Sequence, residues 1–168
     1  MTAPTRRATT AAIQAWRALN RPPDQRWVDW AVRLLTQGAD TPGLRILAGL
    51  LPPLDYFEAT KLVDRTLIEL AISPLDTSSA VEAYTRELLA ELLCDPDVIG
   101  DVLGELAQLC IETSYSRDLM KFYLLRNARD DLTHRDMQHY WAGADRSNID
   151  GIVREEAQRW LDEHKRAA

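Results

Sequence analysis

The sequence of 168 residues lacks the short motifs that bind phosphates or hold catalytic metal ions. Its seven glycines are scattered, so it contains neither a G-x-G-x-x-G stretch nor a phosphate loop ending in Gly-Lys-Ser or Gly-Lys-Thr. The patterns H-E-x-x-H, G-x-S-x-G and C-x-x-C and the calcium-binding loop are missing as well. These absences argue against an enzyme, and we expect no catalytic residue, no cofactor and no bound metal.

Cysteines and long apolar runs are also scarce. Antiparallel consecutive helices would hold Cys94 and Cys110 about 20 Å apart at a rise of about 1.5 Å per residue, whereas a disulfide needs Cα atoms within about 7 Å. We therefore predict two reduced cysteines, both in the core. No stretch reaches the roughly 20 apolar residues of a membrane-spanning helix, and no apolar run typical of a secretory signal is present. We expect a cytoplasmic protein that makes no membrane contact.

Carboxylates are missing from the first 23 residues, which carry four arginines. Because the formal net charge of the chain is −6, the remaining residues carry −10. Nucleic-acid binding relies on clustered lysines and arginines that release counterions from the phosphate backbone. We expect residues 1–10 to form a basic, frayed arm. The rest of the chain is acidic, and this negative charge disfavours DNA and RNA as partners.

Apolar side chains recur at spacings of three and four residues along most of the chain, which is typical of helices rather than strands. Residues that favour helix starts and helix ends separate the segments that carry this pattern. We predict helices around Ile13 and Trp16, from Asp24 to Gly38, from Pro42 to Leu50, from Asp55 to about Ala71, from Thr77 or Ser78 to Asp95, from Pro96 through Cys110, from about Ser116 to Ala128, from Thr133 to Trp141, and after Ser147, which pairs with Asp150 as a capping box.

The predicted fold class is all-α. Short connections keep consecutive helices adjacent, so we expect seven or eight helices stacked as antiparallel hairpins in a bundle that forms one domain over residues 1–168. A short helical solenoid is the second choice, since no repeat with a period of about 34–45 residues is evident.

One segment resembles a known group of proteins. The stretch LRILAGL at residues 44–50, followed by Tyr56, Phe57 and Glu58 and a helix to Leu70, resembles a segment of small, uncharacterised helical proteins of bacteria. The resemblance begins at Trp27 and ends at Ile72. It implies a bacterial cytosolic protein and carries no functional residue.

Aromatic residues occur in pairs that we interpret as core anchors, with a single exposed aromatic as a binding hot spot being the alternative. The pairs are Trp27 with Trp30, Tyr56 with Phe57, and Tyr140 with Trp141. The solvent face of the helix after Asp55 is expected to be a charged stripe of Glu58, Lys61, Arg65 and Glu69.

The strongest candidate for a binding surface is an acidic strip on the helix that follows Pro96. Its members are Asp97, Asp101, Glu105 and Glu112. No Lys or Arg lies three or four residues away to neutralise them, and such like charges destabilise an isolated helix by a few tenths of a kcal/mol each. Gly100 and Gly104 beside the strip would let another backbone approach. The alternative is that the aspartates merely favour the helix dipole and the glycines pack inside the protein.

The leading hypothesis is a non-enzymatic interaction module, in which the acidic helical surface binds, and inhibits, a basic partner protein as an immunity protein does its toxin. A small metal- or ligand-binding enzyme that uses residues 130–141 is the alternative, with His134, Asp136 and His139 as its candidates. On one helix these histidines would point about 140° apart, whereas zinc-binding pairs lie three or four residues apart. A homo-oligomer formed through an apolar helix face is the third hypothesis.

Overall fold

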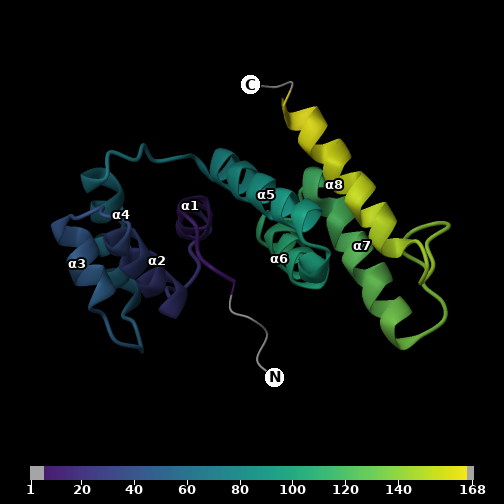
Figure 1. Ribbon diagram of the computed structural model, residues 1–168, viewed down its shortest axis with the longest axis horizontal. Coiled ribbons are helices and arrows are strands. Elements are labelled where there is room, and N and C mark those ends of the chain that lie inside the picture. The colour runs from purple at the N-terminus through teal and green to yellow at the C-terminus, as the bar shows by residue number, and fades with distance from the viewer. Residues whose placement is uncertain (1–5, 166–168) are drawn as a thin grey trace. The chain divides into compact units, whose positions relative to one another are not determined.

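The structure, a computed structural model, describes residues 6–165, and all regular secondary structure in this range is helical. This confirms the predicted all-α fold. The elements are α1 (Thr10–Ala18), α2 (Gln25–Thr36), α3 (Pro42–Ala48), α4 (Tyr56–Glu69), α5 (Thr77–Cys94), the 3-10 turn η1 (Pro96–Val98), α6 (Ile99–Glu112), α7 (Arg117–His134) and α8 (Ile149–Lys165) (Figure 1). Between residues 6 and 165, no helix has the length and apolar character needed to cross a bilayer.

The chain forms two compact units, Met1–Tyr84 and Thr85–Ala168, and α5 begins in the first and ends in the second. In the first unit, α3 contacts both α2 and α4. In the second unit, α7 contacts both α6 and α8. Each unit has its own buried side chains; that the two act as one domain over residues 1–168 stays a prediction.

Tryptophans form the centre of the first unit. Trp16, Trp27 and Trp30 are at most 1% exposed, as their helical spacing predicts. The ring of Trp16 meets the ring of Tyr84 edge to face at 5.9 Å between centroids, and the guanidinium of Arg26 lies 4.2 Å from the Trp16 ring centre. Such contacts add to the free energy of apolar burial, because the ring face attracts positive charge and the edges of other rings.

Most predicted helix boundaries are confirmed. Asp24, Asp55 and Asp95 accept hydrogen bonds from backbone N–H groups at the starts of α2, α4 and η1, respectively. Gly38 adopts a φ of +94° directly after α2, a backbone conformation that favours glycine. Local sequence is sufficient here because cap and helix are only a few residues apart.

Two predicted caps are wrong. The start of α5 is capped by Asp76, whose carboxylate accepts from the Ser79 backbone N–H at 2.8 Å, and not by Thr77 or Ser78. In the turn before α8, Asp145 accepts from the Ser147 backbone N–H at 2.7 Å and from the Ser147 hydroxyl at 2.6 Å, so the predicted capping box of Ser147 and Asp150 does not form. A carboxylate outcompetes a hydroxyl because a charged acceptor makes the stronger hydrogen bond.

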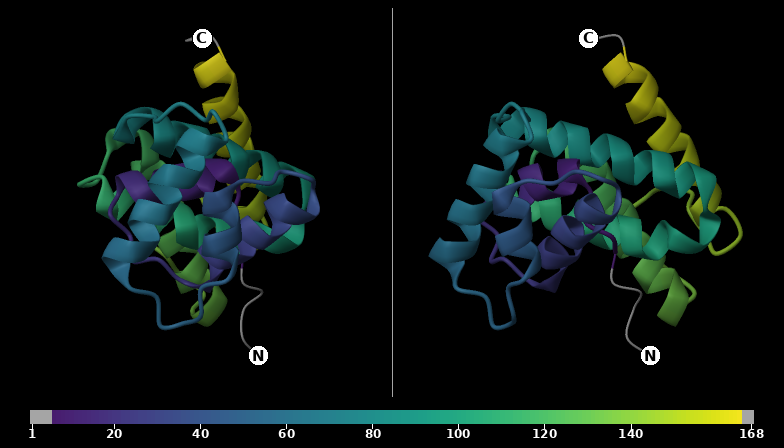
Figure 2. Two further views of the ribbon diagram at one scale, coloured as in Figure 1. Left: turned by 90° about the vertical axis from the view of Figure 1, so that its left-hand side faces the viewer. Right: turned by 60° about the vertical axis from the view of Figure 1, so that its left-hand side comes forward.

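The predicted helix from Thr133 to Trp141 does not exist. Instead α7 continues without a break to His134 (Figure 1), and residues 135–148 form a loop (Figure 2, right). The helix ends where Arg146 reaches back and donates to the carbonyl oxygens of Leu132 at 2.6 Å and Arg135 at 3.0 Å. A distant cation thus supplies partners for carbonyls at the end of the helix, which the local sequence does not specify.

The predicted frayed arm at residues 1–10 does not include residues 8–10. Residues 1–5 lie outside the described residues. Ala8 is 1% exposed, its carbonyl oxygen accepts from Arg33, and the Thr9 hydroxyl accepts from the Ala12 backbone N–H at 3.1 Å to cap α1. The folded part of the first unit therefore already includes Ala8.

Both cysteines are free, as predicted, but only Cys110 is buried, and burial raises the pKa of its thiol. Cys94 is exposed, which corrects the expectation of a core residue. Its position as the last residue of α5 places it where the helix gives way to an exposed turn.

Glycine substitutions test the packing of α3 on α4. A Cβ added at Gly43 would lie 2.6 Å from Thr66 Oγ1 and 3.3 Å from Thr66 Cα, so we expect Gly43→Ala to destabilise the protein by about 1–3 kcal/mol through overpacking. At Gly104 a Cβ would meet nothing within 4 Å, and Gly104→Ala should stabilise α6 by about 0.8–1.0 kcal/mol. Urea unfolding of both variants measures the two effects, and equal midpoints would contradict the described packing.

Acid sensitivity is expected at the contact between α3 and α4. Glu69 accepts from the Gly43 backbone N–H at 2.7 Å and from Arg65 Nε at 2.6 Å, and these bonds, that of Gly43 first, lower the pKa of Glu69. A lowered pKa stabilises the fold above about pH 4.3, the unfolded value, and this stabilisation is lost as pH falls through the folded pKa. The difference in the free energy of unfolding between wild type and Glu69→Gln should therefore become smaller as the pH is lowered from 7 to 3 in denaturant titrations. A difference that does not change with pH would show that the charge of Glu69 does not stabilise the fold.

Candidate functional site

The net charge of the chain is concentrated in one short segment. Residues 85–112, which we call the acidic segment, contain seven carboxylates and one arginine. The residues before them have nine acidic and nine basic side chains, and those after them have ten of each. The whole formal charge of −6 therefore belongs to the end of α5, to η1 and to α6.

The apolar face of α6 fixes this helix in the second unit. As predicted, the residues spaced three and four apart are buried, each at most 1% exposed: Ile99, Val102, Leu103, Leu106, Leu109 and Cys110. Because this stripe faces the core, the opposite side of α6 faces solvent in a fixed orientation.

The predicted acidic strip is uneven. Asp97 and Asp101 are exposed, and within residues 6–165 neither carboxylate makes an ion pair or a hydrogen bond. Glu105 and Glu112 are half-buried and interact with neighbouring groups; one such contact is a 3.2 Å hydrogen bond from Gln108 Nε2 to Glu112 Oε1. The two aspartates, one turn apart, are therefore the members of the strip available to a partner.

The two glycines beside the strip differ in their surroundings. A Cβ at Gly100 would lie 3.2 Å from Nη1 of Arg129 on α7, so this glycine makes room for a side chain of the same unit. Gly104 has open space around it. The internal packing that we considered as an alternative accounts for Gly100 and leaves Gly104 without a packing role.

The structure does not bring together His134, Asp136 and His139, the candidates of the alternative hypothesis. His134 Nδ1 lies 2.9 Å from the Asp130 carbonyl oxygen on α7, Asp136 forms a 2.9 Å ion pair with Arg146, and His139 is exposed in the loop. Across residues 6–165, no group of three His, Cys, Asp or Glu side chains could hold a metal ion.

A glutamine organises the loop that replaces the predicted helix. Gln138 Nε2 donates to the carbonyl oxygens of Trp141 at 2.6 Å and Ala144 at 3.0 Å, while its Oε1 accepts from the backbone N–H groups of Tyr140 and Trp141. A side-chain amide makes such a set of bonds because it carries two donors and an acceptor. The loop is thus held by structural hydrogen bonds.

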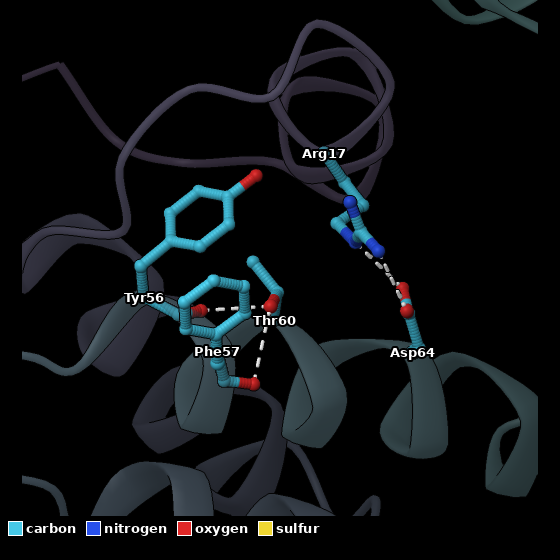
Figure 3. A network of polar contacts seen from close by, with 5 residues as sticks. All are labelled: Arg17, Tyr56, Phe57, Thr60 and Asp64. Atoms are coloured by element: carbon cyan, nitrogen blue, oxygen red, sulfur yellow. Dashed lines mark hydrogen bonds and ion pairs between the residues drawn. The ribbon is translucent and has the colours of Figure 1, made fainter.

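Sequence reasoning did not identify an ion pair that joins α1 to α4 (Figure 3). Arg17 Nε and Nη2 lie 2.8 and 2.9 Å from the two carboxylate oxygens of Asp64, and this hydrogen bonding is the main reason that the pKa of Arg17 is raised. On the same helix the Thr60 hydroxyl lies 2.7 Å from the Tyr56 carbonyl oxygen, and Phe57 is 71% exposed. The 47 residues between Arg17 and Asp64 leave no local signal for this pair.

A shallow hollow of about 240 Å³ lies beside this ion pair. Its lining residues are Gln14, Arg17, Ala18, Asn20, Asp64, Leu67, Pro74 and Leu75. The charged groups of the lining already bind each other, and the lining holds no histidine, cysteine, serine or free carboxylate. These side chains do not form a catalytic arrangement.

Replacing Gln138 tests the organisation of the loop. In Gln138→Ala the backbone N–H groups of Tyr140 and Trp141 lose their acceptor, so we expect their amide hydrogen exchange to rise at least tenfold, a factor equivalent to about 1.4 kcal/mol. His139→Ala removes an exposed neighbouring side chain and should leave these rates unchanged. Similar rates in both variants would show that Gln138 does not hold the loop.

Comparison of this chain with protein-family models, with curated proteins and with solved structures finds no match.

Proposed function

We propose that this protein is a non-enzymatic interaction module whose acidic segment binds a basic region of a partner protein. The observation that carries the proposal is that Asp97 in η1 and Asp101 on α6 are exposed and that neither carboxylate has a partner within residues 6–165, while the other face of α6 is buried. Like charges one turn apart repel each other by a few tenths of a kcal/mol. Cations of a partner would relieve this repulsion.

The charge of the whole segment supports the same function. Seven carboxylates against one arginine in residues 85–112 create a negative field that attracts a basic surface over a distance set by the ionic strength. At about 0.1 M salt this distance is about 10 Å. Complementary charges accelerate encounter and fix the register of the bound partner, so binding should be salt-sensitive.

An inhibitory role of the immunity-protein kind is the more specific form of this proposal. A basic surface that an enzyme uses to bind nucleic acid or another anionic substrate would be covered by the acidic segment. The buried stripe of α6 supports this role, because a helix held in place loses little conformational entropy on binding. A bacterial, cytoplasmic setting accompanies this proposal.

The alternative, a small metal- or ligand-binding enzyme that uses residues 130–141, has less support. Arg146 already binds Asp136, and His134 lies against a carbonyl oxygen of its own helix. We favour a protein partner.

The double substitution Asp97→Asn with Asp101→Asn tests the proposed surface. It removes two charges without changing side-chain size, and we expect about tenfold weaker partner binding, equivalent to about 1.4 kcal/mol. Partners are captured at low salt from a lysate of the source organism, identified by mass spectrometry, and then titrated as purified proteins at several salt concentrations.

The matched control is Glu155→Gln with Glu163→Gln on α8. Both glutamates are exposed, neither has an ion pair or hydrogen bond within residues 6–165, and the change in net charge is the same. Binding should be retained in the control. Equal affinity of wild type and the aspartate variant, or equal losses in both variants, would contradict the assignment of Asp97 and Asp101.

A further inference from the structure

The outer face of α4 carries four side chains that recur at spacings of four, three and four residues. They are Phe57, Lys61, Asp64 and Ile68, which we call the α4 seam. This spacing places them in one line along the helix, the pattern of a seam between two packed helices. Phe57 is 71% and Ile68 is 75% exposed, so two large apolar side chains at the ends of the seam lie in water.

The opposite face of α4 is fully used within the first unit. Ala59, Thr60, Val63, Thr66 and Leu67 are buried there. A rotation of α4 that buried Phe57 and Ile68 would bring the buried stripe into water. These two side chains therefore stay exposed in the first unit.

The middle of the seam is polar, with one charge of each sign. Lys61 is exposed and, within residues 6–165, has no ion pair or hydrogen bond. Asp64 is bound by Arg17, yet its side chain is still 46% exposed. A carboxylate has about four lone-pair sites, so Asp64 has room for a second cation.

The order of these four residues makes the seam complementary to itself. Phe57 and Ile68 are centred on the midpoint between positions 62 and 63, and so are Lys61 and Asp64. When two copies of α4 lie antiparallel about a two-fold axis at this midpoint, Phe57 meets Ile68 of the partner subunit and Lys61 meets Asp64 of the partner subunit. Each contact then occurs twice, as in any isologous interface.

We infer that the α4 seam is the docking surface for a second copy of this chain, packed antiparallel along it. The charges select this orientation, because parallel helices would place Lys61 opposite Lys61 of the partner subunit. Beside the seam, Glu58 and Arg65 lie seven residues apart on one edge of α4. The antiparallel arrangement brings Glu58 near Arg65 of the partner subunit, the kind of flanking ion pair that sets the orientation of packed helices.

The interface is small. A helix of 14 residues is about 21 Å long, and one such pair buries less than the roughly 800 Å² per partner of a standard stable interface. We therefore expect a reversible dimer with a dissociation constant on the order of micromolar or weaker, because interfaces of standard size range from picomolar to micromolar.

Two charge variants of the full chain test the inference by complementation. Phe57→Glu and Ile68→Lys each replace an apolar seam residue by a charge, and each should weaken self-association at least tenfold. Both should fold, since an acid near the start and a base near the end of a helix favour its dipole. Mixed together, they should dimerise again, because Glu at position 57 faces Lys at position 68 of the partner subunit while the second pair stays apolar.

Sedimentation velocity from about 1 to 500 μM covers the expected range of dissociation constants. Val32→Glu on α2, also a change of an exposed apolar residue to Glu, is the matched control and should dimerise like wild type. A wild type that is monomeric up to 500 μM, or variants that associate like wild type, would overturn the inference. Failure of the mixture to associate would overturn the antiparallel register. These variants leave residues 85–112 unchanged, so the result is independent of the proposed function.

Discussion

The burial of one apolar stripe on each amphipathic helix is the constraint on which the surface of this protein depends. On α6 the stripe that runs from Ile99 to Cys110 faces the core, so Asp101 faces solvent, and Asp97 is exposed in η1 directly before this helix. On α4 the stripe around Val63 does the same and leaves Phe57 and Ile68 exposed. Moving either exposed set into the interior would bring the buried stripe of that helix into water, which costs about 25 cal/mol per Å² of apolar area. Both candidate surfaces are therefore fixed by packing on the far side of their helices.

Carboxylates occur in two different environments in this chain. Asp76 lies at the start of α5 and Asp145 in the turn before α8, where N–H or hydroxyl groups hold their charge and lower the pKa of each. Asp97 and Asp101 have no such partners within residues 6–165. The charges of Asp76 and Asp145 are thus held by hydrogen-bond donors of the protein, whereas the charges of Asp97 and Asp101 are not.

The two proposed surfaces belong to different units and have different chemistry. The acidic segment of residues 85–112 suits a basic partner, through long-range attraction that salt weakens. The α4 seam suits a second copy, through short-range apolar contacts with one pair of opposite charges at its centre. A dimer would present two acidic segments to partners, which increases avidity when a partner has two basic sites.

The sequence by itself determined the helical fold, the buried stripe of α6, most helix starts and the location of the negative charge, because these depend on residues within one or two turns of each other. The tertiary structure alone decided where α7 ends, since Arg146 supplies the partners for its carbonyls from fourteen residues away. It also decided the exposure of Phe57, which its aromatic pairing with Tyr56 led us to interpret as a core anchor. Aromatic character predicts burial on average, but the neighbouring helices determine which face of α4 is covered.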